Sequence, residues 1–195
     1  MSGPEMDAEA RAEVSEAVRE ALARHGYERL TTARIAAEYD KSEAGLYYYF
    51  DSKDEMIAAF LEEATTHLNE DLLAVDDDDP ERALREACDC LFRSPGDPYA
   101  GVAVGIMELL SHAPYNETLR KPLLELESVI LERLVEIVES GVEQGVFRPV
   151  DPRATAAFLL AAADGTTGFY IALEMDVDEE LQAGLSAYID SLVAE

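Results

Sequence analysis

The chain has 195 residues and carries 42 aspartates and glutamates against 15 lysines and arginines, a formal net charge of −27. This length allows a small domain and a larger one with a shared helical core. Two cysteines, Cys88 and Cys90, stand two apart on a predicted helix and cannot bridge each other, which excludes a disulfide framework. We find no signal peptide and no apolar run that could span a membrane, so we expect a cytoplasmic protein without a membrane partner.

The acidic charge is unevenly distributed along the chain. Residues 1–53 carry 11 acids and 7 bases, whereas residues 54–195 carry 31 acids and 8 bases. Two of the three lysines, Lys41 and Lys53, lie in the first part, and Lys121 lies in the second. Scarce lysine and abundant acid are typical of halophilic archaea, whose molar salt screens charges within about 3 Å. An acidic mesophilic protein is the alternative.

The first predicted elements form a three-helix head. An apolar stripe at helical spacing predicts a helix over residues 7–25, ended by Gly26. A short helix over residues 31–39, a turn at Asp40-Lys41 and a second short helix over residues 42–49 follow. Thr31 and Ser42 are suitable N-caps for these two helices. This is the layout of a helix-turn-helix, whose second helix enters the major groove of double-stranded DNA.

The second short helix carries the side chains expected to meet DNA. Ala44 and Gly45 keep its start slim, and the hydroxyls of Tyr47 and Tyr48 can donate to phosphates. Residues 52–55 read as a capping box, which places Lys53 in a first helical turn that disfavours a cation unless phosphate lies nearby. Glu43 could accept from a cytosine amino group, although a solvated acid at a helix N-terminus is an equally good interpretation. Residues expected near bases are Lys41, Ser42, Glu43, Ala44 and Gly45, and those expected near phosphates are Thr31, Arg34, Tyr47, Tyr48 and Lys53.

These residues also resemble a known family. The ordered set resembles the N-terminal signature of the tetracycline-repressor (TetR) family and comprises Gly26-Tyr27, Thr31, Ile35-Ala36, Ser42, Leu46-Tyr47, Tyr49-Phe50 and Ser52-Lys53. The family's A-G-V turn is Tyr39-Asp40-Lys41 here, and its G-T pair is Ala44-Gly45, so a threonine that commonly contacts phosphate is missing. The resemblance implies a dimeric regulator that reads an inverted-repeat operator.

The rest of the chain also predicts helices, and no strand pattern or internal repeat is found. We therefore expect an all-α fold of about nine helices, with a helix-turn-helix DNA-binding domain over residues 1–53 and a ligand-binding and dimerisation domain over residues 54–195. A helix from residue 52 begins beside the recognition helix and would link the two domains mechanically. The later helices are predicted over residues 52–75, 80–93, 99–112, 116–144 with a bend or break near Pro122, 151–173 and 177–193.

The last two helices carry residues suited to a subunit interface. Small residues at spacings of three and four would let another helix approach closely, and the resemblance implies a four-helix bundle shared by two subunits. A homodimer matches the two-fold symmetry of paired half-sites, whereas an intrachain core is the alternative for some of these residues. They are Ala154, Ala157, Ala161, Gly165 and Gly168, followed by Leu181, Leu185, Tyr188, Ile189 and Leu192.

The resemblance further implies a small-molecule effector bound among the fourth to eighth helices. The apolar bias of that region favours a mostly hydrophobic effector. Asp164, which interrupts an apolar helix, could be a polar anchor or could bond across the dimer. Plain core is the favoured alternative for the apolar candidates, and a surface or capping role is the favoured alternative for His67. The candidates are Phe60, His67, Leu91, Met107, Leu110, Phe158, Asp164 and Phe169.

We therefore expect a transcriptional repressor released by its effector. The alternative is a DNA-binding adaptor of the same fold that acts through a protein partner without an inducer. Three histidines, no nucleophile and base pair and no glycine-rich phosphate loop argue against an enzyme. We expect no cofactor and no metal.

Overall fold

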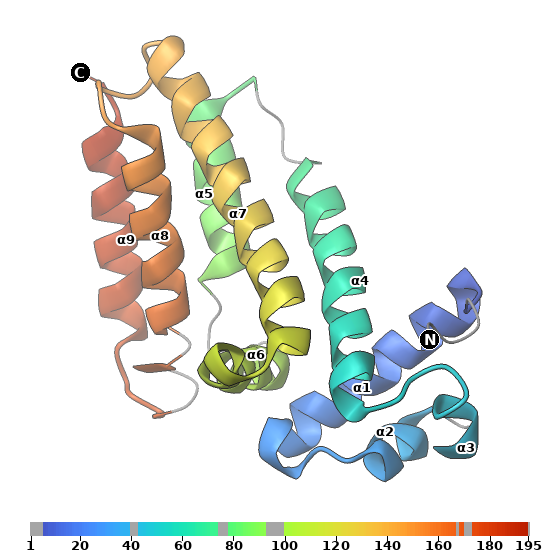
Figure 1. Ribbon diagram of the computed structural model, residues 1–195. Helices are drawn as coiled ribbons and strands as arrows, with labels where there is room; N and C mark the ends of the chain where they lie inside the picture. The colour runs from blue at the N-terminus through green and yellow to red at the C-terminus, as the bar shows by residue number, and fades with distance from the viewer. Residues whose placement is uncertain are drawn as a thin grey trace. The chain divides into compact units, whose positions relative to one another are not determined.

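The computed structural model describes residues 6–39, 43–73, 78–92, 100–166, 168–169 and 173–194 (Figure 1). Within these ranges the protein is built from α-helices, and its only extended pairing is an isolated bridge between Phe147 and Val193. The all-α prediction is confirmed. The helices are α1 (Ala8–Arg29), α2 (Thr32–Glu38), α3 (Glu43–Leu46), α4 (Lys53–Leu73), α5 (Pro80–Leu91), α6 (Ala100–His112), the 3-10 turn η1 (Ala113–Tyr115), α7 (Glu117–Glu143), α8 (Pro152–Thr166) and α9 (Asp178–Leu192).

Helix starts follow their capping residues. Asp79 Oδ1 accepts a hydrogen bond of 3.1 Å from the backbone N–H of Arg82, and Asp151 Oδ1 accepts one of 3.0 Å from Ala154. Each aspartate satisfies an N–H that has no partner within its helix. The proline that follows each one needs no such partner, so the Asp-Pro pairs begin helices where expected.

Three predicted helix boundaries can be compared with the structure. Gly26 ends the regular part of α1 as predicted, because its φ of +66° and ψ of 167° are not helical, and one further turn then runs to Arg29. Helix α7 runs through Pro122, which lies inside it, so the predicted break is wrong, while the predicted bend stays a prediction. The described part of α8 ends at Thr166, and residues 168–169 are again helical, with a wider π-type turn in which the Leu173 N–H bonds to the Gly168 carbonyl at 3.2 Å.

The chain divides into two compact units, which are described separately here. Unit 1 comprises residues 1–67 and 98–126, and unit 2 comprises residues 68–97 and 127–195. Helices α4 and α7 therefore each contribute residues to both units. The functional boundary predicted after residue 53 is a different division and stays a prediction.

Unit 1 has a core of side chains from the helix-turn-helix and the helices packed on it. Leu22 of α1, Ile35 of α2, Leu46 of α3, Ile57 of α4 and Leu109 of α6 are all fully buried. The apolar stripes predicted for the first and fourth helices therefore face this core. Burial of this kind contributes about 25 cal/mol for each Å² of apolar surface.

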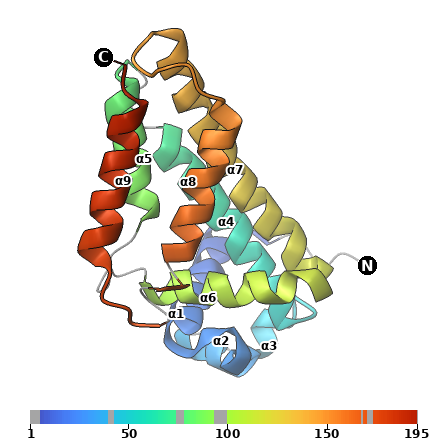
Figure 2. The same cartoon turned by 90° about the vertical axis from the view of Figure 1, so that its left-hand side faces the viewer.

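Unit 2 is a bundle made from α5, the later part of α7, α8 and α9. Leu84, Leu134, Phe147 and Leu159 meet in its core, and α8 and α9 lie side by side (Figure 2). Phe147 packs so tightly on α7 that a Cβ atom added to Gly141 would lie 2.1 Å from its ring. None of the described helices is long and apolar enough to cross a membrane.

Candidate DNA-binding site

The helix-turn-helix is formed by α2 and a very short α3. Thr31 caps α2, because its Oγ1 accepts a hydrogen bond of 3.3 Å from the Arg34 N–H. The first predicted helix is thereby confirmed, but the second is shorter than predicted and ends at Leu46 instead of Tyr49. The backbone N–H groups of Tyr49 and Phe50 both bond to the Leu46 carbonyl at 3.0 Å, which closes the helix into a turn.

The α3 segment turns its apolar side inward and its tyrosines outward. Leu46 is buried, whereas Ala44 is exposed and Tyr47 and Tyr48 are 51% and 64% exposed. Large apolar groups that are exposed next to each other often mark a contact surface. Of the other residues predicted near bases, Gly45 is half-buried. Lys41 and Ser42 lie outside the described residues, as does the side chain of Glu43.

Tyr47 also has a structural partner. Its hydroxyl donates a hydrogen bond of 3.1 Å to Thr32 Oγ1, which joins the turn after α3 to the start of α2. The tyrosine can still use its lone pairs and ring edge toward DNA. Its phosphate contact stays a prediction.

The two cations predicted near phosphates hold the end of α1. Arg34 Nη1 donates to the Arg29 carbonyl. Lys53 Nζ donates to the carbonyls of Tyr27 at 3.2 Å and Leu30 at 3.4 Å. It also lies 4.1 Å from the centre of the Tyr27 ring, a cation–π contact. Both cations are therefore held at the corner between α1 and α2, where carbonyl groups without helical partners favour positive charge.

Three arginines gather near this corner, and one of them, Arg24, is paired with Glu38. The pKa of His25 is lowered, first by desolvation and then by the charges of Arg34 and Arg24, while Glu38 acts in the opposite direction. Arg29 bonds through Nε to the His25 carbonyl at 3.0 Å. Arg24, Arg29 and Arg34 recur every five residues, a signal that was missed. A positive corner in an acidic chain suits a phosphate backbone.

The capping box at the start of α4 is only half formed. Ser52 Oγ accepts a hydrogen bond of 3.2 Å from the Glu55 N–H, as predicted. The Glu55 carboxylate instead accepts from the Asp51 N–H at 2.7 Å, one residue earlier than the usual capping box requires.

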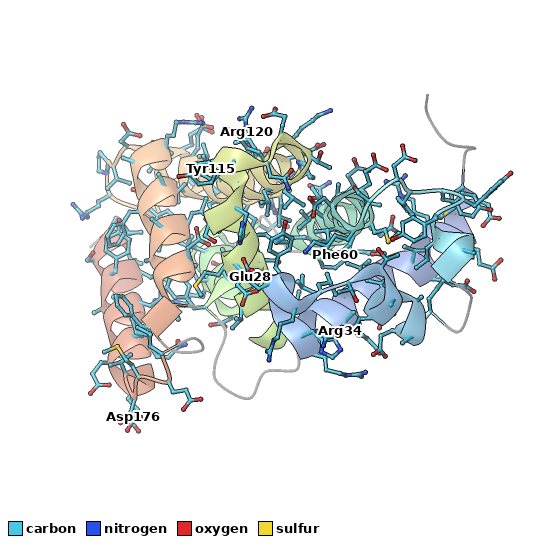
Figure 3. All side chains as sticks on the ribbon, turned by 60° about the horizontal axis from the view of Figure 1, so that its bottom comes forward. Glu28, Arg34, Phe60, Tyr115, Arg120 and Asp176 are labelled. Carbon is cyan, nitrogen blue, oxygen red and sulfur yellow. The ribbon has the colours of Figure 1, made fainter. Side chains whose placement is uncertain are left out.

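The candidate effector residues are divided between the two units. In unit 1, Phe60 is buried on α4 (Figure 3), Met107 and Leu110 are half-buried on α6, and His67 is exposed with Nε2 3.5 Å from Glu63. In unit 2, Leu91 is half-buried, whereas Phe158 and Phe169 are exposed and Asp164 has substantial solvent contact. Their assignment to an effector site stays a prediction.

Unit 2 contains a buried carboxyl group that the sequence analysis missed. Burial raises the pKa of Glu127 to about 7, and the negative charge of Asp164 adds to the rise. Partial desolvation of its carboxyl group also raises the pKa of Asp164, although the residue keeps substantial solvent contact. The Oε2 atom of Glu127 is shielded from solvent without a hydrogen-bond partner. Its position three residues before Ile130 and four after Leu123, on the apolar side of α7, was the available signal.

One side of α8 and α9 carries small and apolar residues that are at least partly exposed to solvent. Phe158 of α8 packs against Tyr188 of α9 with ring centres 4.9 Å apart, yet 56% of Phe158 is exposed. A Cβ atom added to Gly165 or Gly184 would meet nothing within 4 Å. We call this set the open face; its members are Ala154, Ala157, Phe158, Ala161, Gly165, Leu181, Gly184, Leu185 and Tyr188. Ile189 and Leu192, also predicted for the interface, are buried in the core of unit 2.

Comparison with known sequences and structures agrees with this geometry. Residues 14–60 match the model of bacterial regulatory proteins of the tetR family, and residues 80–194 match that of the C-terminal part of BetI-type transcriptional repressors. The chain is 31% identical over 159 residues to the uncharacterised HTH-type transcriptional regulator YfiR of Bacillus subtilis. The matched region covers 79% of this chain and 76% of YfiR. The chain is 32% identical over 154 residues to the nucleoid occlusion factor SlmA of Vibrio campbellii, covering 75% of each.

A solved structure extends the likeness to the whole fold. The crystal structure of a TetR transcription regulator from Haloarcula marismortui superposes with a TM-score of 0.85 at 30% identity, over 96% of this chain and 100% of that one. The fold and family are those of transcriptional regulators and not those of enzymes. The chain therefore belongs to the TetR family of DNA-binding transcriptional regulators.

Proposed function

We propose that the protein is a homodimeric repressor that binds an inverted-repeat operator and leaves it when a small, mostly hydrophobic effector binds. The helix-turn-helix, with Tyr47 and Tyr48 exposed on the turn directly after α3, is the observation that carries the DNA-binding part. The match of residues 80–194 to BetI-type repressors supports repression over activation. The predicted division, with DNA binding in residues 1–53 and the other functions in residues 54–195, belongs to this proposal. So does a cytoplasmic location.

The open face of α8 and α9 supports the dimer. Phe158 is exposed, and Gly165 and Gly184 have free space beside them, so a second copy of the chain could approach this surface closely. A two-fold dimer would also place two helix-turn-helix units for half-sites about 34–36 Å apart. Sedimentation equilibrium should give twice the chain mass at micromolar concentration, and a monomer there would contradict the proposal.

The sequence reading of the DNA contacts is part of the proposal. Lys41, Ser42, Glu43, Ala44 and Gly45 would approach bases, and Thr31, Arg34, Tyr47, Tyr48 and Lys53 would hold phosphates. Tyr48→Phe should then weaken binding to every duplex by a similar factor, whereas Glu43→Gln should change the preference between sequences. Parallel losses for both variants across a panel of duplexes would count against this division of roles.

The direct experiment is selection of fragments of the source genome by the purified protein in molar potassium chloride. A short inverted repeat should be recovered, because a symmetric dimer reads two equal half-sites. Failure of a folded dimer to enrich any sequence would remove the repressor proposal. Native mass spectrometry of the protein isolated from its own cells should reveal one small apolar molecule per chain.

Similarity to SlmA proteins supports a second candidate. Several nucleoid occlusion factors are about 30% identical over some three quarters of this chain, so the adaptor alternative remains open. Such an adaptor would bind DNA without release by any small molecule and would need a protein partner. Retention of operator binding in the presence of the cell's total small-molecule extract would favour the adaptor over the repressor.

We also propose that the protein comes from a halophilic archaeon. The net charge of −27 and the presence of only three lysines support this origin, as does the similar structure from Haloarcula marismortui. Self-repulsion of the acidic surface should weaken as salt screens it. The unfolding temperature should therefore rise between 0.2 and 3 M potassium chloride, and a flat dependence would contradict the halophilic origin.

A further inference from the structure

Helix α6 lies directly against α1 within unit 1 (Figures 1 and 2). A Cβ atom added to Gly105 would lie 2.5 Å from Leu22 Cγ, and one added to Gly101 would lie 2.8 Å from the Ala23 carbonyl oxygen. No larger side chain fits at either position without displacing α1. Any movement of α6 toward α1 or along it must therefore move α1 as well.

The same side of α6 continues with two polar residues. Glu108 and His112 follow Gly105 at spacings of three and four, so all three lie on one face of the helix. Glu108 Oε2 accepts a hydrogen bond of 2.5 Å from the backbone N–H of Tyr27. The conformation of Gly26 permits this approach, since a Cβ atom there would lie 2.9 Å from Glu108 Oε2.

His112 makes the second polar contact with α1. Its Nε2 lies 2.9 Å from Glu28 Oε1, and its ring centre lies 4.6 Å from that of Tyr27. Figure 3 shows Glu28 beside α6. Two consecutive residues of the last turn of α1 are thus held by α6.

Tyr27 also connects α1 to the start of α4. Its hydroxyl donates to Asp54 Oδ1 at 3.2 Å, and Asn116 Nδ2 donates to Asp54 Oδ2 at 2.8 Å. Lys53 contacts the Tyr27 ring and carbonyl from the same helix start. The last turn of α1, which leads directly into the α2 cap at Thr31, is therefore held from α6 and from α4.

We propose that Glu108 is a positioning residue that sets the direction of the last turn of α1, and through it the orientation of the helix-turn-helix. His112 assists it through Glu28. The candidate effector residues Met107 and Leu110 lie beside Glu108 on the same helix, so an effector that shifts α6 would disturb the Glu108 contact. That consequence rests on the proposed function, whereas the positioning role does not.

The test measures a distance within one chain. Spin labels are placed at Ala44→Cys on α3 and Lys121→Cys on α7, both exposed and both in unit 1. Exposed Cys90 is replaced by serine. Buried Cys88 is retained, because burial raises its pKa to about 12 and keeps its thiol unreactive. Labelled protein is diluted with unlabelled protein, so that only distances within a chain are recorded by pulsed electron resonance.

The parent protein should give one narrow distance distribution. Glu108→Ala should broaden or shift it by several ångströms, and Glu108→Gln, which keeps an oxygen acceptor for the Tyr27 N–H, should restore most of it. Glu117→Ala is the matched control, since Glu117 is an exposed carboxylate of unit 1 that pairs with Arg120 on its own helix. A residue that merely stabilised the fold would lower the unfolding temperature without changing the distance measured far below it.

An unchanged distribution in folded Glu108→Ala would overturn the proposal, and so would an equal disturbance in Glu108→Gln. If Glu108→Ala does not fold, His112→Ala is measured instead, with a smaller broadening expected and an unchanged distribution again overturning the proposal. The experiment uses neither operator nor effector. Its failure is therefore distinct from a failure of the DNA selection that tests the proposed function.

Discussion

Two sets of small helical residues in this protein have different surroundings. Gly101 and Gly105 on α6 meet α1 so closely that a Cβ atom would clash, whereas Gly165 and Gly184 on α8 and α9 face open space. Small residues at helical spacing therefore predict close approach of another helix, but they do not say whether that helix belongs to the same chain. Among the described residues, the small-residue face of α6 is covered by α1 of the same chain, whereas Gly165 and Gly184 have no neighbour within 4 Å of an added Cβ atom.

The two units also differ in whether their partly buried carboxylates have hydrogen-bond partners. In unit 1, Glu108 and Asp54 each accept hydrogen bonds from other segments. In unit 2, Glu127 Oε2 is shielded from solvent without a partner. A buried group left unpaired costs free energy that a bound partner or proton can offset. Four substitutions test this contrast, beginning with the largest expected effect.

Gly105→Leu should disrupt the filled face. The new side chain would overlap Leu22 of α1, and overpacking of this kind lowers the free energy of unfolding by about 3 kcal/mol. Thermal unfolding followed by circular dichroism should show a transition at least several degrees lower. A variant as stable as the parent would mean that α1 and α6 are not closely packed.

Gly184→Leu makes the same substitution on the open face. Leucine is the better helix former by somewhat less than 1 kcal/mol, so the single chain should lose no stability. Association should nevertheless weaken about 100-fold, or about 2.7 kcal/mol, because the side chain would hold a second copy away. Sedimentation equilibrium measures this, and a dimer of unchanged affinity would show that the open face is not the interface.

Glu127→Gln should stabilise unit 2 in a pH-dependent manner. The folded-state pKa of Glu127 is raised to about 7 from 4.5, so the folded protein holds this proton more tightly than the unfolded chain does. Ionisation of the carboxyl group therefore does not lower the free energy of unfolding below pH 4.5, and it lowers it progressively between pH 4.5 and pH 7. Above pH 7 the free energy of unfolding of the variant should exceed that of the parent by about 2 kcal/mol.

Unfolding at pH 4 and pH 8 in the same salt measures this difference. Glu125→Gln is the control, because Glu125 is an exposed glutamate of the same helix. An equal gain for Glu127→Gln at both pH values would contradict titration of the buried carboxyl group.

Lys53→Met should have the smallest effect of the four. It removes the cation from the carbonyls of Tyr27 and Leu30 while keeping a side chain that can pack on the Tyr27 ring. We expect a loss of about 1 kcal/mol in unfolding free energy, or a fall of about 2–4 °C in unfolding temperature. Exposed Lys121→Met is the matched control and should change the unfolding temperature by less than a degree.

Operator binding by the same pair separates the two roles of Lys53. If the lysine also approaches phosphate, Lys53→Met should weaken binding to all duplexes and lower its salt dependence. Unchanged DNA affinity in a destabilised variant would leave Lys53 with its structural role alone.

The sequence by itself determined the features that depend on near neighbours in the chain. Asp79 and Asp151 cap helices because the N–H that each accepts from lies three residues later. Apolar residues at helical spacing turn to one side of a helix wherever that helix lies, so the helical fold and the helix-turn-helix could be predicted without knowledge of packing. The length of α3 was overestimated, because Tyr49 and Phe50 bond to one carbonyl of Leu46 and close the turn.

The tertiary structure alone decided which elements meet and which groups lose their water. Contacts between residues far apart in the chain carry no fixed spacing, so nothing in the sequence placed Glu108 of α6 on the Tyr27 N–H. Lys53 looked like a free phosphate ligand until α1 supplied two carbonyls. The place of Glu127 on the apolar side of α7 could be read from the sequence, but the rise in its pKa depends on how far the folded chain removes its carboxyl group from water and on the charge of Asp164.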